Sequence, residues 1–252
     1  MGTSANSAQR CNLIYWYMPQ EDFCLCHKKQ AFSGLHNCMA TGVFAVLEGI
    51  DGSGKSTTAL ELSRRLEERS LQTVVLREPT EKTDASREIR RILRTVQSVD
   101  AAVSRELLDL FLIDRLWDLK HQIIPALKAG KIVLLDRYFL STAAYQSANT
   151  TDVQAIMQSY LGDDRIRMPD ILIHLTLPVE AALMRLEERR QLDVFETETR
   201  LNLIAHNYGT AITLLRESRP EVQVIELAHA LGDEDFDLLA DKIAAVAAKK
   251  KL

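Results

Sequence analysis

One continuous run of residues in this sequence has the types and the spacing that bind a polyphosphate. The run Gly49-Ile50-Asp51-Gly52-Ser53-Gly54-Lys55-Ser56 fits the pattern G-x-x-x-x-G-K-[ST]. Small residues allow successive backbone N–H groups to turn inward on phosphate oxygens, and a helix N-terminus behind them adds favourable partial charge. Lys55 would reach the β- and γ-phosphates, Ser56 would supply a hydroxyl to Mg²⁺, and Thr57 would follow in the first helical turn. The alternative is a glycine turn before an ordinary helix.

A second candidate group is an acidic residue at the end of an apolar run. Residues 132–135 are Ile-Val-Leu-Leu and are followed by Asp136. Nucleotide-binding proteins of the phosphate-loop class hold Mg²⁺ with an aspartate in this position, usually through water. A buried strand can also end in Asp as a turn signal, so the metal interpretation depends on the phosphate loop. Arg137 comes next and would place a permanent cation where a second phosphate could lie.

The elements that must position these groups are short apolar strands that alternate with helices. We predict strands at 43–47, 73–76, 132–135, 171–177 and 222–227, and helices at 57–68, 86–95, 104–128, 141–147 and 153–161, with a further long helix from Pro178. Continuous apolar strands separated by helices predict an α/β fold with a parallel sheet that is covered on both faces. Ligands then bind at the carboxyl ends of the strands, where the phosphate loop, residues 77–80 and Asp136 all lie.

Composition limits the classes of function. The chain has 252 residues, of which 46% are hydrophobic, so it can bury a core. Its net charge of −4 excludes the basic footprint of a nucleic-acid binder, and we interpret Lys249-Lys250-Lys251 as a solvated end. No apolar run is long enough to span a bilayer, so we expect no membrane partner. All the cysteines precede residue 40, so residues 41–252 give no sign of an oxidising compartment, and we place the protein in the cytoplasm.

Residues 1–40 differ from the rest of the chain because they lack hydrophobic periodicity. We predict that they are a poorly ordered N-terminal extension or an upstream start assigned in error, since Met39 stands just before the first strand. A metal cluster is the alternative, with the candidate ligands Cys24, Cys26, His27, His36 and Cys38, but their spacing matches no standard zinc framework.

Beyond these motifs, the chain resembles the thymidylate kinases, which belong to the nucleoside monophosphate kinases. The resemblance runs from about residue 41 to the end, and its specific segments are residues 47–51, 77–79, 110–115, 125–130, 136–138 and 141–146. It implies a P-loop NTPase three-layer sandwich, in which helices cover both faces of a five-stranded parallel sheet. It also implies transfer of the ATP γ-phosphoryl group to dTMP, giving dTDP, with Mg²⁺ as the cofactor and commonly in a homodimer.

The resemblance assigns the base of dTMP to two neighbouring segments. Phe111 would stack on the thymine ring and Arg115 would bond its carbonyl edge, and residues four apart share a helix face. Ser141 or Thr142 would meet the N3 side of the ring, in the segment that also contains Gln146. The alternatives are a core aromatic at Phe111 and helix capping at the hydroxyl residues.

The resemblance also assigns the sugar and the acceptor phosphate. Tyr145 would pack against the deoxyribose and leave no room for a 2′-hydroxyl, and Asp51 would bind the 3′-hydroxyl. Arg90 and Arg137 would clamp the phosphate, although Arg90 lies beside Arg91 and could simply face solvent.

Phosphoryl transfer also needs cations for the charge that spreads over the moving group. The family supplies them either from an arginine inside the phosphate loop or from a mobile lid. This loop has no arginine, so the resemblance points to a lid near residues 185–196 with Arg185, Arg189 and Arg190 as candidates. A helix face paired with Glu187 and Glu188 is the alternative.

Val194 departs from the family pattern, which usually has arginine between Asp193 and Phe195. We therefore expect Val194→Arg to raise kcat in a coupled assay of ATP and dTMP, because it restores one transition-state cation. An unchanged or lower kcat would contradict this.

Two further positions depart from the family pattern: Thr176 stands where the fourth strand commonly has aspartate, and residues 81–84 stand where the loop after Pro79 usually has glycines. Two other functions stay open, namely a same-fold kinase for another nucleoside monophosphate and an ATP-binding regulator with low activity.

Overall fold

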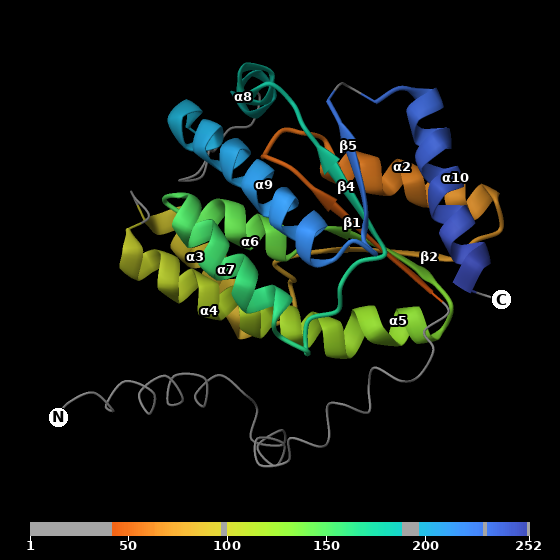
Figure 1. The fold of residues 1–252 in the computed structure, drawn as a ribbon, viewed down its shortest axis with the longest axis horizontal. Helices are drawn as coiled ribbons and strands as arrows, with labels where there is room; N and C mark the ends of the chain where they lie inside the picture. The colour runs from red at the N-terminus through yellow and green to blue at the C-terminus, as the bar shows by residue number, and fades with distance from the viewer. Residues whose placement is uncertain (1–41, 97–99, 188–196, 229–230, 251–252) are drawn as a thin grey trace, which may run out of the picture.

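The computed structural model of this chain describes residues 42–96, 100–187, 197–228 and 231–250. Its centre is a five-stranded sheet in the order β2-β3-β1-β4-β5, and every neighbouring pair is parallel (Figure 1). The strands are β1 (Val43–Glu48), β2 (Thr73–Arg77), β3 (Ile132–Asp136), β4 (Ile171–Leu175) and β5 (Gln223–Leu227). The predicted five-stranded parallel sheet is confirmed. Residues 1–40 lie outside the described part, so their assignment as a separate extension stays a prediction.

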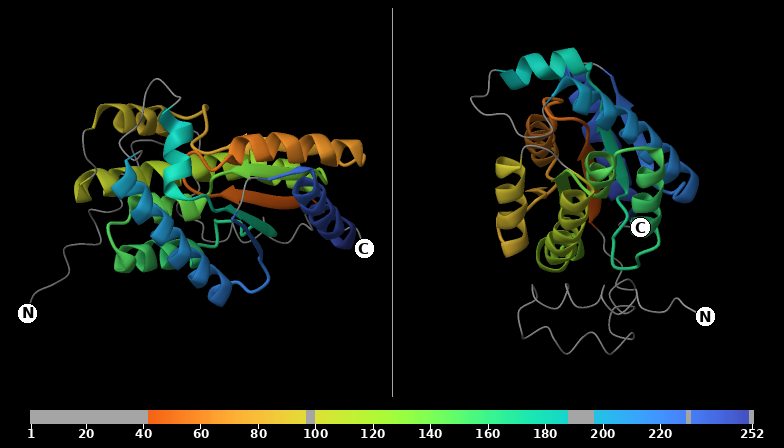
Figure 2. Two further views of the ribbon diagram at one scale, coloured as in Figure 1. Left: turned by 90° about the horizontal axis from the view of Figure 1, so that it is seen from above. Right: turned by 90° about the vertical axis from the view of Figure 1, so that its left-hand side faces the viewer.

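Helices cover both faces of this sheet (Figure 2). Successive side chains of a strand point to opposite faces, and all of β1 is buried, so β1 contributes to two cores. Val43, Ala45 and Leu47 pack in the smaller core with α2 (Lys55–Glu68) and α10 (Asp233–Lys250). Phe44 and Val46 pack in the larger core on the other face. The three-layer arrangement predicted from the apolar strands is therefore confirmed.

The larger core is built by the remaining described helices. They are α3 (Asp84–Thr95), α4 (Ala101–Asp118), the π-helical turn η2 (Leu119–Ile123), α5 (Ile124–Lys128), α6 (Phe139–Gln146), α7 (Thr150–Leu161), α8 (Val179–Glu187) and α9 (Glu198–Ser218). None of the described helices combines the length and the apolar character that a bilayer crossing needs.

The single long helix predicted from Pro178 is wrong. Thr197 has extended dihedral angles, with φ −112° and ψ 150°, so α9 begins only after it and is separate from α8. Strand β4 ends at Leu175 rather than at the predicted residue 177, just before Thr176 and Pro178 lead into α8.

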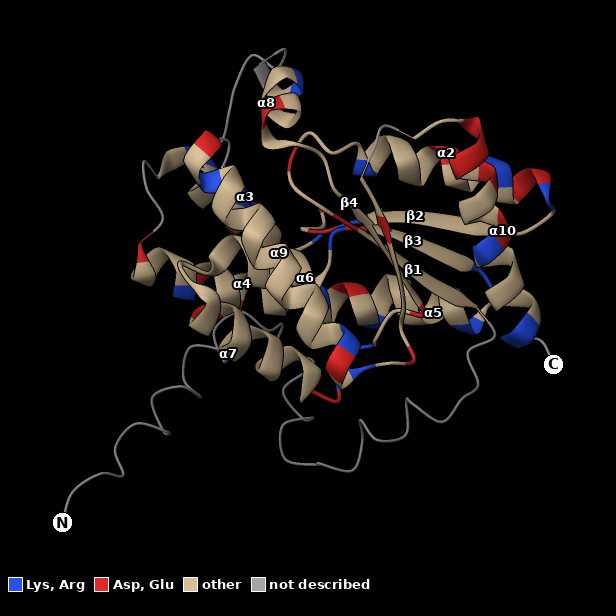
Figure 3. Ribbon diagram, turned by 45° about the horizontal axis from the view of Figure 1, so that its top comes forward, with Lys and Arg blue, Asp and Glu red and all other residues tan. Residues whose placement is uncertain are grey.

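Helix α10 was not predicted at all. It lies along α2 (Figure 3). The two helices are joined by ion pairs from Arg65 to Asp237 at 2.8 Å and from Arg69 to Asp241 at 3.0 Å.

The interpretation of Lys249-Lys250-Lys251 as a solvated end is wrong for Lys250. Its ammonium group donates to the Asp170 carboxylate at 2.6 Å and to the Gly42 carbonyl at 3.1 Å. The same carboxylate accepts the N–H of Phe44 at 2.8 Å. Asp170 directly precedes β4, and its half-buried carboxylate gains a cationic partner in this way. The end of α10 is therefore fixed to the first strand.

The strand register decides where the candidate site forms. Strands β1 and β3 are neighbours, and Leu47 of β1 is paired with Asp136 of β3. The phosphate loop follows β1 directly, so it emerges beside Asp136 and Arg137 at the carboxyl end of the sheet. This is the edge at which parallel α/β sheets bind ligands.

Candidate active site

The phosphate loop has the backbone conformation that its glycines allow. Gly49, Gly52 and Gly54 have φ angles of 144°, 80° and 94°. A Cβ atom at Gly52 would lie only 2.8 Å from the carbonyl oxygen of Ala182 in α8, so both the dihedral angle and the close approach require glycine there. Helix α2 begins at Lys55, immediately after the loop, and directs its N-terminus at the concave side.

Lys55 is held inside this loop. Its ammonium group donates to the Ile50 carbonyl at 2.7 Å and to the Ser53 hydroxyl at 3.3 Å, and the residue is buried. Burial, and then the positive charge of Arg137, lower the pKa of Lys55 to about 7. A polyphosphate in the loop would favour the protonated amine, because it adds negative charge next to the ammonium group.

Ser56 and Asp136 fit the requirements of a divalent cation. The Ser56 hydroxyl donates to Oδ2 of Asp136 at 2.5 Å, which brings the two predicted metal ligands together. The other carboxylate oxygen, Oδ1, is buried and has no hydrogen-bond partner among the described residues. Hydroxyl and carboxylate oxygens are the donors that Mg²⁺ prefers.

A cavity of about 120 Å³ lies beside the loop. It is lined by Asp51, Arg77, Glu78, Pro79, Leu93, Phe111, Arg115, Arg137, Tyr138, Ser141, Thr142, Tyr145 and Gln146. Every predicted acceptor-binding residue except Arg90 therefore lines one cavity, although these residues come from four separate segments of the chain. Their individual roles stay predictions.

Arg115 is fixed in the wall of this cavity. Its Nε and Nη2 atoms both donate to Oε2 of Glu78, at 2.8 and 2.6 Å, and Nη2 also donates to the Thr142 hydroxyl at 3.1 Å. The guanidinium group lies 4.9 Å from the ring centre of Tyr138 and 5.0 Å from that of Tyr160. Its Nη1 atom is buried without a hydrogen-bond partner among the described residues. A ligand carbonyl could accept from this nitrogen, since guanidinium groups only donate.

Arg137 connects the loop with the cavity. Its guanidinium group donates to Asp51 at 2.6 Å and to the Gly49 carbonyl at 3.2 Å, both in the loop. It also donates to the Tyr145 hydroxyl at 3.0 Å and to the Ser141 hydroxyl at 3.1 Å, both in α6. The backbone of Arg137 has φ 73°, a conformation that costs energy for a residue other than glycine and recurs at functional sites.

Asp51 is the carboxylate that this arginine neutralises. Burial alone would raise the pKa of Asp51, but the charges of Arg137 and Lys55 outweigh it and hold the pKa well below its usual range. The Tyr145 hydroxyl donates to the second oxygen of Asp51 at 2.7 Å. Asp51, Tyr145 and Arg137 thus form one connected polar group between the two parts of the site.

Arg90 is the predicted residue that the structure does not bring to the cavity lining. Its guanidinium group donates to the backbone carbonyls of Ser86 at 2.9 Å and Pro79 at 3.4 Å, and also to that of Thr80. It therefore supports the segment after β2, and its role as a phosphate clamp stays a prediction.

Only residues 185–187 of the predicted lid lie within the described part of the chain. Arg185 of α8 donates to the Gly52 carbonyl at 3.1 Å, so its positive charge lies against the phosphate loop. Arg189, Arg190 and Val194 lie outside the described residues. Of the three arginines expected to supply cations from residues 185–196, the described residues therefore locate Arg185.

Sequence reasoning gave no role to three buried residues at this site. Glu78 holds Arg115, and Glu48 accepts hydrogen bonds from the backbone and hydroxyl of Ser141 in α6. Tyr208 of α9 contacts both Glu48 and the loop carbonyl of Gly49. A signal for Glu48 existed, because a carboxylate directly after an apolar strand must find partners. Tyr208 is distant in sequence from its partners, and no local pattern identifies it.

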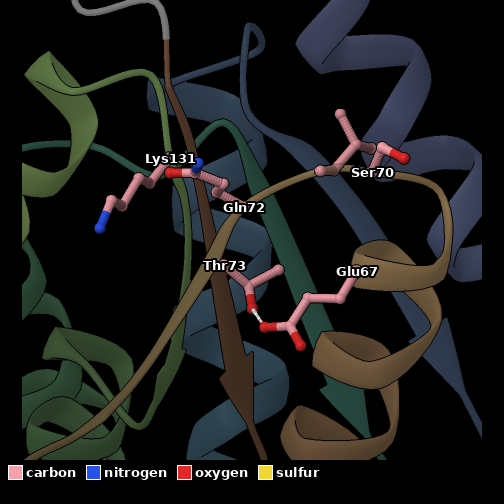
Figure 4. Close-up of a pocket in the computed structure, with 6 residues that line it drawn as sticks. Glu67, Ser70, Gln72, Thr73 and Lys131 are labelled. Carbon is pink, nitrogen blue, oxygen red and sulfur yellow. Dashed lines mark hydrogen bonds between the residues drawn. The ribbon is translucent and has the colours of Figure 1, made fainter.

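A second hollow lies away from this chemistry. It is lined by residues at the end of α2 and the starts of β2 and β3, and Figure 4 shows Glu67 and Thr73 in contact there, at 2.7 Å. Since these are the amino ends of the strands, the hollow is at the opposite edge of the sheet from the phosphate loop.

The fold and the site together define a P-loop kinase, because a phosphate loop at the end of β1 adjoins a second pocket that is lined by cationic and aromatic side chains. The family model "Thymidylate kinase" matches residues 47–230. The chain belongs to the thymidylate kinase family.

Individual relatives are similar over most of their length. The probable thymidylate kinase of Pyrococcus horikoshii is 36% identical over 202 residues, which cover 79% of this chain and 95% of that protein. The thymidylate kinase of Leptospira borgpetersenii is 40% identical over 168 residues, which cover 66% and 80%. That of Akkermansia muciniphila is 40% identical over 160 residues, which cover 64% and 74%.

Proposed function

We propose that this protein transfers the γ-phosphoryl group of ATP to dTMP, giving ADP and dTDP for the synthesis of dTTP. Family membership gives the reaction. The structural observation that supports it best is the position of Arg137, whose guanidinium group contacts both the phosphate loop and the wall of the adjacent cavity. A cation placed between two phosphate subsites is what in-line transfer requires.

The donor phosphates would lie in the loop. Backbone N–H groups of residues 49–57 and the Lys55 ammonium group would bind them, and Ser56 and Asp136 would hold Mg²⁺. The bound metal ion would neutralise phosphate charge. The orphaned Oδ1 atom of Asp136 supports this assignment, because a buried carboxylate oxygen without a donor is costly unless a cation satisfies it.

The acceptor would occupy the cavity. Phe111 would stack on the thymine ring, Nη1 of Arg115 would donate to a ring carbonyl, and Thr142 and Gln146 would meet the remaining ring edge. Asp51 and Tyr145 would bind and enclose the deoxyribose, so that its 5′ phosphate lies at Arg137. The guanidinium donor favours a base with a carbonyl at the reading edge over cytosine, which presents an amino group there.

The protein's part in the transfer would be position and charge. The nucleophile is a phosphate oxygen of dTMP, which is largely ionised at neutral pH because the second pKa of a phosphate monoester is about 6. A general base is therefore unnecessary. Lys55, Arg137 and Arg185 would surround the moving phosphoryl group with positive charge.

A coupled assay that offers ATP and Mg²⁺ with each nucleoside monophosphate in turn tests the proposal. We expect dTMP to have the highest kcat/KM. Faster turnover of dCMP or dUMP would instead indicate a same-fold kinase for another monophosphate. ATP affinity without dTDP formation would indicate a regulatory ATP-binding protein.

Replacing Phe111 by alanine should raise the KM for dTMP about tenfold or more while kcat changes little. Loss of one base–aromatic stacking contact costs about 1–3 kcal/mol of binding, and Phe111 lines the cavity from α4 rather than from the phosphate loop. Steady-state kinetics at saturating ATP measures this. Leu112→Ala is a matched control, because Leu112 neighbours Phe111 on α4 and packs in the core without lining the cavity. An unchanged KM would exclude Phe111 from base stacking.

The homodimer and the cytoplasmic location are further proposals. The first comes from the resemblance to the family, and the second comes from the sequence argument on cysteines. Light scattering on the purified protein tests the dimer, and a monomer at micromolar concentration would refute it.

A further inference from the structure

Tyr208 occupies a position that the proposed mechanism does not use. It belongs to α9, and its side chain is fully buried. Its hydroxyl lies 2.7 Å from Oγ of Ser141, 3.0 Å from Oε2 of Glu48, 3.2 Å from the carbonyl oxygen of Gly49 and 3.4 Å from Nη1 of Arg137. A hydroxyl offers one donor and two acceptor positions, so four partners exceed what it can satisfy at once.

The four partners belong to both sides of the reaction. Gly49 is the first residue of the phosphate loop, and Glu48 is the last residue of β1. Ser141 lies in α6, which forms one wall of the acceptor cavity. Arg137 is the cation between the two. One hydroxyl therefore touches the donor loop, the acceptor wall and the residue that connects them.

Glu48 extends this group into the backbone of α6. Its Oε1 atom accepts the N–H groups of Tyr138 at 2.9 Å and Ser141 at 3.2 Å. These are N–H groups at the N-terminus of α6, whose own N-cap residue supplies no side-chain bond. A carboxylate of β1 thus caps α6, and it keeps that cap while its other oxygen bonds Tyr208.

Helix α9 is also tied to α6 directly. Asn207 donates to the carbonyls of Ala144 at 3.0 Å and Ser147 at 3.2 Å, and Arg200 donates to that of Tyr145 at 2.7 Å. Tyr208 differs from these two residues because it alone among them also reaches the phosphate loop. The contacts of Asn207 hold α9 to α6 without involving the loop.

We propose that Tyr208 is a positioning residue that couples the ATP subsite to the dTMP subsite through its hydroxyl group. Binding of phosphate in the loop changes the hydrogen-bond partners of the Gly49 carbonyl and Arg137. The Tyr208 hydroxyl then shifts its hydrogen bonds between Glu48 and Ser141, and these two residues orient α6 toward the acceptor. Coupling of this kind is reciprocal, so each ligand raises the affinity of the other by the same factor. The inference rests on the proposed function.

The test is the affinity of dTMP, measured by calorimetry with and without a non-hydrolysable ATP analogue and Mg²⁺. In the wild type, we expect the analogue to tighten dTMP binding about fivefold or more, the lower range of allosteric couplings. Tyr208→Phe keeps the ring and its contacts with His174 and Tyr145 but removes the hydroxyl. We expect this variant to lose most of the enhancement and to lower kcat, with little change in the affinity for dTMP alone.

Asn207→Ala is the matched control, since it removes a buried hydrogen-bonding group one residue away on the same helix. We expect it to lower Tm while the enhancement persists. Glu48→Gln is a second probe, because it keeps the size of the side chain and weakens its bond to Tyr208. We expect it also to reduce the enhancement.

The outcomes separate this inference from the function on which it rests. A wild-type protein that forms no dTDP overturns the proposed function and the inference together. An active wild type with no enhancement overturns the inference alone. So does a Tyr208→Phe variant that keeps the full enhancement and kcat with only a lower Tm, and so does an equal loss of enhancement in Asn207→Ala.

Discussion

The Lys55→Ala variant is expected to form dTDP about a thousand times more slowly than the wild type at saturating ATP and dTMP, because one preorganised donor to the transition state is worth about 10²–10³ in kcat and this one carries a full charge. The Lys55 ammonium group lies inside the phosphate loop, where its present partners are a neutral carbonyl and a hydroxyl. Alanine should leave the loop backbone in place, but it removes the positive charge that we propose stabilises the γ-phosphoryl group during transfer.

A coupled assay with excess enzyme measures this loss, and circular dichroism shows whether the variant folds. Lys131→Ala is the control, because Lys131 lies in the hollow at the opposite edge of the sheet (Figure 4). It should retain nearly wild-type kcat. A kcat of Lys55→Ala within about tenfold of the wild-type kcat would be too high if Lys55 stabilises the transferred phosphoryl group. That result would refute the assignment of the site.

The Arg185→Ala variant is expected to lower kcat about a hundredfold, while the KM values for ATP and dTMP change little. Arg185 contacts the loop through the Gly52 carbonyl at 3.1 Å and is the one lid cation that the described residues locate. Its side chain is exposed, so the loss should fall on the transition state rather than on folding.

Steady-state kinetics of Arg185→Ala beside Met184→Ala checks this prediction. Met184 precedes Arg185 on α8 and is 70% exposed, so its replacement changes the same helix without removing a charge. An Arg185→Ala variant with wild-type kcat would place the transition-state cations elsewhere in the lid. A rise in both KM values at constant kcat would instead make Arg185 a ground-state binding residue.

The part of this site that the sequence predicts is the part formed by residues close together in the chain. Gly49 to Ser56 is a contiguous motif between a strand and a helix, and its geometry follows from glycines and a helix N-terminus. The sequence also indicated that Asp136 would lie near the loop, because both follow apolar strands of one parallel sheet. The acceptor residues came from the resemblance to a family, which transfers non-local information that periodicity does not contain.

The unpredicted features depend on contacts between distant segments. Tyr208 meets Glu48 across 160 positions, and Lys250 meets Asp170 across 80. A local pattern cannot specify which buried hydroxyl will serve a carboxylate that far away. The start of α9 was missed for a different reason, since its only local signal is a threonine at the N-cap position, Thr197, with no glycine or proline beside it.

The close approach of Gly52 to α8 limits how positive charge beside the phosphate loop could be rearranged. Any side chain at position 52 would collide with the backbone of Ala182, and α8 would have to withdraw to make room. That withdrawal would carry Arg185 away from the loop. In this geometry an arginine at position 52 is incompatible with the present contact between Arg185 and the loop, and grafting one there would discard that contact.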